Sequence, residues 1–441
     1  MRVCFVSPNF PPEVNAPATR LHEHAREWVR GGGDVDVITD VPNYPEGVVY
    51  PGYENRYSEE DVDGIRVHRV PMMTAPNAGS AKRIASFVSF MLSAIWHRKN
   101  VAAHPDVIVA TSPQFFSAIA GWWIAKRFRV PFVLEIRDLW PESIVAVGAM
   151  KRNAAIRMFE RIERFLYRSA DHVVVVTDAF VEHVVAGGAR PENVTVLKNG
   201  ADLGRLVPPP DDVRAEIRRR HGWEGKFVAA YTGTIGMAHR ADILLEAAKR
   251  CPDPDVQWVV IGTGAERAAL EAATAEADLD TFTLVDKQPR ERILGYLAET
   301  DVAVVHLRDT PLFRTVIPSK LFEAMAFGVP IAHGVQGESR ALVEAAGVGL
   351  GFASEDADAL VDTVLRLKSD PALYAQIQAD ARDAVSRDFD RRVVARRYWS
   401  LLERVAGVGT ADRGPQTALQ AGADVSGPST HSSQSPIPAS P

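Results

Sequence analysis

Short apolar runs alternate with helical segments along almost the whole chain, and no other feature constrains its fold as strongly. In the first half, apolar runs such as 3–7 and 107–110 are separated by segments like 19–30, where apolar residues recur at helical spacing. The second half repeats this pattern from 228 to 352. Strands that are apolar along their whole length and separated by helices are typical of parallel sheets covered on both faces. The sequence therefore predicts an α/β fold with two Rossmann-like, doubly wound domains.

The length of 441 residues suits two domains of ordinary size. Residues 199–202 predict a turn, and the three prolines at 208–210 predict a stiff linker. Two such domains form a cleft between the carboxyl ends of their strands, where ligands of parallel sheets bind. We expect an N-terminal domain at 1–205, a C-terminal domain at 206–388, a closing helix at 389–405 and a tail at 406–441 that is disordered because it has few large apolar residues.

The composition limits the cellular compartments and the cofactors that fit this chain. The chain is 46% hydrophobic and 24% charged, as in soluble globular proteins. Its two cysteines, Cys4 and Cys251, lie far apart, which indicates a reducing compartment and no disulfide framework. There is no signal-peptide pattern and no run of about 18 apolar residues, so we expect a cytoplasmic protein. Phosphate-loop, zinc-protease and paired-cysteine motifs are missing, so we expect no metal or cofactor. We also expect no nucleic-acid partner.

The segment 318–330 predicts a helix that begins at a phosphate. Pro318 and Ser319 suit its first positions, and Lys320 adds a positive charge there. The N–H groups and the dipole at a helix N-terminus attract phosphate. Glu323 follows one turn later, where its carboxylate can accept hydrogen bonds from sugar hydroxyls. The pattern fits a nucleotide-sugar site, and it equally fits an ordinary capped helix of an α/β domain.

Two glycine-rich turns follow strands of the second half. Gly233 and Gly236 come after the first of these strands, with Arg240 able to clamp a diphosphate. Gly262 and Gly264 follow the next strand and suit the base or ribose end of a nucleotide, although a lone G-x-G is a weak signal. The alternative is a pair of ordinary turns with a solvated arginine.

The first half carries polar groups at the same edge of its predicted sheet. Residues 15–20 lead into the first helix, with N–H groups facing the cleft. Residues 135–143 end a strand with three carboxylates, an arginine and a tryptophan, as in sites with acid and base groups beside an aromatic platform. Surface loops also show this composition.

A basic and aromatic region covers 80–170, which holds 14 basic and six acidic residues. Residues 84–96 are apolar on nearly all sides and are flanked by lysines and arginines, and 151–168 places arginines at helical spacing. The first segment is too short to span a bilayer but suits a helix lying in the membrane interface. A buried helix beside solvated faces explains the pattern equally well.

Together these motifs resemble the retaining nucleotide-sugar glycosyltransferases of family 4, which have the GT-B architecture. The resemblance covers about 1–405, and residues 10–13, 135–143 and 318–330 are similar to the bacterial surface-polysaccharide, fucosamine-transferase-like subgroup. Thr315 departs from the family pattern, because it stands where the usual first glutamate of a pair would be.

The resemblance implies roles for individual residues. It implies that Glu323 holds the donor ribose, that Arg240 lies near a phosphate-binding position, and that Asp138 lies close to a histidine position beside the reacting sugar. The implied catalytic residues are Asp138, Arg240 and Lys320. The implied donor-binding residues are Gly233, Thr234, Gly236, Gly262, Gly264, Glu266, Arg314, Thr315, Ser319, Leu321 and Glu323. The implied acceptor-side residues are Asn15, Arg20, Arg137, Trp140 and Glu142.

The implied reaction transfers a sugar, with retention, from a nucleotide-diphosphate sugar that is UDP-linked. The implied acceptor is a polyprenyl-diphosphate-linked or glycan molecule of surface-polysaccharide biosynthesis. The implied location is cytoplasmic and peripheral, on the inner face of the plasma membrane. Two alternatives remain: a non-hydrolysing nucleotide-sugar epimerase, which would isomerise a UDP-sugar alone, and a non-catalytic carbohydrate-binding protein, which Thr315 makes plausible.

Overall fold

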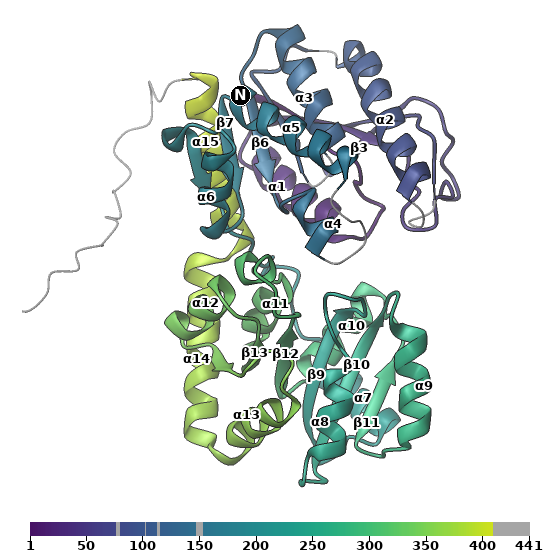
Figure 1. Cartoon of the computed structure of the whole chain (residues 1–441), viewed down its shortest axis with the longest axis vertical. Helices are drawn as coiled ribbons and strands as arrows, with labels where there is room; N and C mark the ends of the chain where they lie inside the picture. The colour runs from purple at the N-terminus through teal and green to yellow at the C-terminus, as the bar shows by residue number, and fades with distance from the viewer. Residues whose placement is uncertain (76–79, 102, 113–114, 147–152, 409–441) are drawn as a thin grey trace, which may run out of the picture.

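The computed structural model describes residues 1–75, 80–101, 103–112, 115–146 and 153–408. Its strands form two separate sheets, one in each half of the molecule, as Figure 1 shows. Within the described residues the first sheet has the order β3-β4-β2-β1-β5-β6-β7-β8 and the second β11-β10-β9-β12-β13-β14. Every pair of neighbouring strands in the described residues is parallel except β3–β4. The predicted pair of doubly wound domains is therefore confirmed.

The first sheet is buried between two layers of helices. Its strands are β1 (Arg2–Val6), β2 (Asp34–Asp40), β3 (Ser58–Val62), β4 (Ile65–Val70), β5 (Val107–Thr111), β6 (Phe132–Ile136), β7 (His172–Val175) and β8 (Val194–Val196). Its helices are α1 (Ala16–Arg30), α2 (Ser80–His97), α3 (Phe115–Phe128), α4 (Glu142–Ala146), α5 (Ala154–Ser169) and α6 (Ala179–Ala186), with 3-10 turns at Arg98–Asn100 and Pro191–Asn193. The central strands β1 and β5 are almost wholly buried, as their continuous apolar sequences predict.

Strand β3 was not predicted from the sequence. It reads Ser-Glu-Glu-Asp-Val and forms a hairpin with β4 through Asp63 and Gly64, which both have positive φ. An edge strand needs no apolar alternation and gains from charge, because charged side chains discourage pairing with another chain. The apolar periodicity that revealed the other strands is therefore missing here.

The second sheet repeats the arrangement. Its strands are β9 (Phe227–Thr234), β10 (Val256–Thr263), β11 (Phe282–Val285), β12 (Val302–His306), β13 (Ile331–Gly334) and β14 (Gly349–Gly351). The helices around it are α7 (Asp211–His221), α8 (Ile243–Arg250), α9 (Arg267–Ala277), α10 (Arg290–Ala298), α11 (Lys320–Phe327), α12 (Glu338–Ala346), α13 (Ala357–Ser369) and α14 (Pro371–Asp388), with a 3-10 turn, η3, at Phe313–Thr315. Sequence reasoning assigned no element to α7 or α14, because α7 has no buried residue and α14 buries only four of its 18 residues.

The chain crosses between the halves twice, and the two crossings lie side by side. The N–H of Ala201 donates to the carbonyl of Phe389 at 2.9 Å, and the N–H of Arg391 donates to the carbonyl of Ala201 at 2.9 Å. After the second crossing, α15 (Arg391–Ala406) packs against α1, with the indole of Trp28 donating to the carbonyl of Ala395 at 2.8 Å. The predicted closing helix is thus confirmed. Most of the predicted tail, from 409 onward, lies outside the described residues.

Helices α2, α3 and α5 form one layer over the first sheet, with α3 between the other two (Figure 1). Phe87 of α2 lies 6.4 Å from Phe116 of α3, and Trp122 of α3 lies 5.0 Å from Phe165 of α5, measured between ring centroids. The layer buries α2 through Phe90 and Ala94. Among the described helices, none is both long and apolar enough to cross a bilayer.

Candidate functional site

Helix α11 begins in the predicted place, at the carboxyl-end side of the second sheet. Ser319 occupies its N-cap position, as its place at the predicted helix start requires, but its side chain makes no capping hydrogen bond. The N–H groups of Leu321 and Phe322 donate instead to the carbonyls of Pro318 and Ser319, both at 3.1 Å. The helix dipole still points its positive end outward from this turn.

Lys320 is the unusual residue of this turn. Its Nζ is buried, has no hydrogen-bond partner and lies 3.4 Å from the ring centroid of Tyr231. Burial lowers the pKa of Lys320 to about 7, although the nearby Glu323 carboxylate opposes this shift. A buried ammonium without an acceptor is costly. An anion arriving at this point would therefore be stabilised by Lys320 and by the helix dipole together.

The two glycine-rich turns lie beside Lys320. A Cβ at Gly233 would lie 3.3 Å from the Lys320 Nζ. Gly262 has a φ of 155°, and a Cβ there would overlap the carbonyl oxygen of Gly233; one at Gly264 would overlap that of Ile235. Only glycine allows these backbones to approach so closely. The structure thus brings the predicted glycines and Lys320 together.

The remaining predicted donor-side residues have varied surroundings. Arg240 has a φ of 46° and donates to the carboxylates of Asp242 and Glu355, at 3.0 and 2.8 Å. The exposed Arg314 is paired with Asp309 at 2.8 Å. Both guanidinium groups are therefore already engaged by carboxylates, unlike Lys320, and their predicted roles at the diphosphate stay predictions.

The other predicted donor residues lie in η3, in α11, at and just after the end of β9, and at the start of α9. The Thr315 hydroxyl donates to the carbonyl of Leu312 at 2.6 Å. Glu323 is exposed on the first turn of α11. Thr234 is exposed at the end of β9, Gly236 is half-buried, and Glu266 is exposed at the start of α9, where its N–H donates to the carbonyl of Ile235 at 3.0 Å.

In the first half, the predicted acceptor-side arginines hold the scaffold, and Arg20 is buried while Arg137 is half-buried. Arg20 donates to the Glu135 carboxylate at 3.0 Å and to the Asn199 side chain at 2.7 Å, and it is only 4% exposed. Arg137 donates to the carbonyls of Ser112 and Pro17, at 3.2 and 3.4 Å. Burial lowers the pKa of Arg137 to about 10. These contacts tie the end of β6 to the start of α1, where Asn15 caps the helix.

Asp138, Trp140 and Glu142 follow β6 in one turn. Burial raises the pKa of Asp138, and hydrogen bonds from Ser143 and from the Leu139 N–H limit the rise. The Trp140 ring stacks on Phe159 at 5.3 Å, and the Glu142 carboxylate lies 3.6 Å from the His183 ring nitrogen. A carboxyl group with a raised pKa in such a turn can exchange a proton near neutral pH more readily than an ordinary aspartate.

The crossing residues approach the donor-side helix, and sequence reasoning missed them. The Phe389 ring lies 4.9 Å from the Phe322 ring of α11. The guanidinium of Arg391 lies 3.2 Å from the Glu23 carboxylate, and it is close enough to Glu323 for that carboxylate to oppose the lowering of its pKa by burial. No local pattern signals these contacts, because the partners are distant in the sequence.

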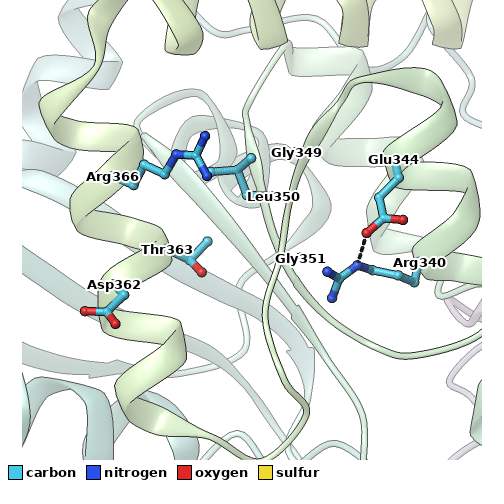
Figure 2. A pocket seen from close by; sticks show the side chains of 8 residues that line it. All are labelled: Arg340, Glu344, Gly349, Leu350, Gly351, Asp362, Thr363 and Arg366. Carbon is cyan, nitrogen blue, oxygen red and sulfur yellow. Dashed lines mark hydrogen bonds and ion pairs between the residues drawn. The ribbon is translucent and has the colours of Figure 1, made fainter.

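A hollow of about 370 Å³ lies elsewhere, between α12, α13 and the outer strand β14, as Figure 2 shows. Arg340 is bonded there to Glu344 and donates to the carbonyl of Phe352 at 3.2 Å. The hollow is at the side edge of the second sheet and shares no residue with the predicted donor site. Its lining residues are Arg340, Glu344, Gly349, Leu350, Gly351, Asp362, Thr363 and Arg366.

Comparisons with known proteins agree with this geometry. A model of the glycosyl transferase 4-like domain matches residues 15–200, and a model of glycosyl transferases group 1 matches residues 213–384. WcaI of Escherichia coli (strain K12), a glycosyl transferase named for colanic acid biosynthesis, is 24% identical over 408 residues, covering 90% of this chain and 98% of the relative. The chain belongs to the family 4 glycosyltransferases, with the GT-B fold.

Two further similarities extend the comparison. A GDP-mannose-dependent alpha-mannosyltransferase of Mycobacterium tuberculosis is 28% identical, covering 85% of this chain and 90% of the relative. The crystal structure of HepE from Anabaena in complex with UDP superposes with a TM-score of 0.67 at 17% identity, covering 92% of this chain and 100% of HepE. The second similarity shows the shared fold. The chain is thus a glycosyltransferase, related to enzymes of polysaccharide biosynthesis.

Proposed function

We propose that this glycosyltransferase takes a sugar, with retention, from a UDP-linked donor whose diphosphate binds between Lys320, the start of α11 and the glycine turns. The observation that carries the proposal is the buried Lys320 Nζ without an acceptor. The structural relative HepE was crystallised with UDP, which supports the choice of base. Glu323, exposed one turn along α11, is proposed to accept hydrogen bonds from the ribose hydroxyls.

The proposed chemistry needs electrostatic stabilisation and no protein nucleophile or metal ion. The bond between the anomeric carbon and the diphosphate oxygen breaks, and the acceptor oxygen bonds to the same face of that carbon. The acceptor proton passes to the departing diphosphate oxygen. Lys320 and the α11 dipole would stabilise the negative charge that develops there, which is commonly the largest catalytic contribution. Asp138, at the facing edge of the first half, is proposed to contact the reacting sugar.

The donor proposal is tested by thermal unfolding with UDP, GDP, TDP and ADP. A nucleotide at about 100 times its dissociation constant should stabilise the folded protein by about 2.7 kcal/mol. We expect this shift with UDP, and we expect Lys320→Met and Glu323→Ala to lose it. Lys249→Met is the matched control, because Lys249 is exposed and paired with Glu246 at 2.9 Å. GDP belongs in the panel because one relative is named for GDP-mannose. A shift with GDP alone would overturn the choice of base.

We further propose that the acceptor is linked to a polyprenyl diphosphate and is met at the inner face of the plasma membrane. The proposal is supported by the side chains exposed on the outer side of the layer made by α2, α3 and α5. Leu92 and Trp96 of α2 are 58% and 66% exposed, and Met158 and Phe165 of α5 are 50% and 40% exposed. The exposed basic residues of this layer are Lys82, Arg83, Lys99, Lys126, Arg127, Arg157, Arg161, Arg164 and Arg168. Apolar anchors among basic side chains suit an anionic lipid surface.

Vesicles containing anionic lipid test this surface. We expect the protein to sediment with them at low salt and to be released as salt rises, since the attraction is screened. The double variant Leu92→Ser, Trp96→Ser should lower retention several-fold. The control is Val207→Ser, Val213→Ser, which removes exposed valines outside this layer. Equal retention of both double variants would reject the surface.

The alternatives predict other products. An epimerase would convert a UDP-sugar into an isomer without any acceptor, and a non-catalytic protein would release no nucleotide with any acceptor. Incubating UDP-sugars with and without lipid-linked acceptors therefore separates the three. We expect nucleotide release only when an acceptor is present.

A further inference from the structure

Glu338 links the two halves of the molecule at a point separate from the chain crossings. It is the first residue of α12, which follows strand β13 of the second sheet. Its Oε1 accepts a hydrogen bond from the N–H of Asp178 at 2.8 Å, and its Oε2 accepts one from the N–H of Ala179 at 2.7 Å. These N–H groups open α6 in the first half. Figure 1 accordingly shows α12 directly below α6.

The charges around Glu338 explain why a carboxylate suits this position. The N-terminal ends of α6 and α12 face each other here, and each carries a partial positive charge. The Nζ of Lys198 adds a full positive charge, 3.6 Å from the Glu338 carboxylate and 2.7 Å from the Asp178 carboxylate. The Glu338 side chain is only 12% exposed, so water screens these interactions little. Without the Glu338 carboxylate, the two helix ends would face each other across the boundary, with only the Asp178 carboxylate left to balance Lys198.

The contact is also connected to the donor side. Gly337 precedes Glu338 with a φ of 80°, and a Cβ there would overlap the carbonyl of Arg314 in η3. The glycine therefore lets the start of α12 pack closely on the segment that leads into α11. On the other side, Lys198 immediately precedes Asn199, which accepts from Arg20. Glu338 thus joins the rigid scaffold of the first half to the loops beside Lys320.

We propose that Glu338 is a positioning residue that fixes the angle between the two halves, and with it the placement of donor and acceptor. A glycosyl transfer requires both substrates in one geometry, and a small rotation of one half displaces them. Glu338 touches neither reacting group. It acts by holding the N-terminus of α6 against α12.

The distance between the halves tests this inference without any substrate. Spin labels at Glu192→Cys and Glu276→Cys, both exposed positions in opposite halves, report the distance in a Cys251→Ser background. We expect Glu338→Gln to broaden or shift the distance distribution, because one amide oxygen cannot serve both N–H groups and the charge is lost. The matched control, Glu344→Gln, makes the same change on the same helix beside Arg340 and should leave the distribution unchanged. Identical distributions for Glu338→Gln and wild type would overturn the inference.

Kinetic measurements then distinguish a positioning role of Glu338 from a direct contact between Glu338 and the donor. The kinetic arm rests on the proposed function, whereas the distance arm does not, so failure of one is distinguishable from failure of the other. We expect Glu338→Gln to lower kcat about tenfold while the donor KM changes less than about threefold. A rise in KM with unchanged kcat would instead show a donor-binding role and overturn the inference. If Glu338→Gln does not fold, Lys198→Met serves in its place and should broaden or shift the same distance distribution relative to wild type, and an unchanged distribution would overturn the inference.

Discussion

Buried cations in the two halves of the molecule differ in how they are paired. In the first half, Arg20 and Arg137 each donate to acceptors of the protein itself. In the second half, the Lys320 Nζ is buried without any acceptor. A charge that is satisfied internally holds the scaffold, whereas a buried charge left unsatisfied is stabilised only when a ligand arrives. The pairing, more than the residue type, therefore distinguishes scaffold from site.

The largest expected effect comes from removing a paired arginine of the first half, which tests whether such pairs hold the scaffold. Arg20→Met leaves the Glu135 carboxylate buried and unpaired, so we expect the free energy of unfolding to fall by about 3–5 kcal/mol. Urea unfolding measures the loss. Arg30→Met is the control, since the pair of Arg30 with Glu27 is exposed, and it should change stability by less than about 0.5 kcal/mol. If both variants are equally mild, Arg20 does not hold the scaffold.

The next effect concerns the close approach of the glycine turns. Gly262→Ala and Gly225→Ala both place a side chain at positive φ, 155° and 72°, but a Cβ meets nothing within 4 Å at Gly225. We expect Gly225→Ala to cost about 1 kcal/mol and Gly262→Ala about 2–3 kcal/mol. Only Gly262→Ala should also weaken the thermal shift with UDP. Equal costs would show that the turns can separate without penalty.

The pH dependence of stability tests whether the buried Lys320 Nζ lacks a partner in the folded protein. The pKa of Lys320 is about 7 in the folded protein, against an ordinary value of 10.5. Between these values the unfolded chain binds one more proton at this residue, so its contribution to stability rises with pH, by up to about 1.4 kcal/mol per pH unit. Urea unfolding between pH 7.5 and 9 should show this rise in wild type and in Lys249→Met, and Lys320→Met should lose it. Parallel curves for all three proteins would mean that Lys320 is paired or solvated.

The smallest expected effect concerns Arg240. Its guanidinium donates to Asp242 and Glu355, so Arg240→Met should change the dissociation constant of UDP by less than about threefold, measured by calorimetry. A loss of tenfold or more would show that Arg240 leaves these carboxylates to clamp the diphosphate. In that case the contrast between paired and unpaired cations would fail in the second half.

Most of the fold could be predicted because its signal is local. The central strands are continuous apolar runs, and the turns between them carry glycine or proline. Strand β3 could not be predicted because its residues are mostly charged, and α7 could not be predicted because none of its residues is buried. Contacts with neighbouring elements and charged side chains stabilise both elements, and neither contribution leaves a periodic pattern of apolar residues in the sequence.

The site could be predicted in part for the same reason. The glycine turns are predicted from their positions after strands, and Lys320 from the start signals of its helix. That Lys320 lies over Tyr231, and that Arg20 pairs with Glu135, depends on packing between distant segments. Glu338 contacts residues 159 and 160 positions away, and no local sequence pattern marks it. Sequence spacing thus finds the loops of a site, while tertiary contacts decide which charges in those loops are free.

The paired crossings of the chain have a consequence for engineering. Because α15 returns to pack on α1, the first half is built from both ends of the chain, and the second half is an insertion between Ala201 and Asp390. Exchanging the second half between relatives therefore requires two junctions, one at each crossing, because a single splice point would leave α1 packed against a helix from the other protein. A graft that keeps both junctions preserves the Trp28 contact and transfers the second half as one unit.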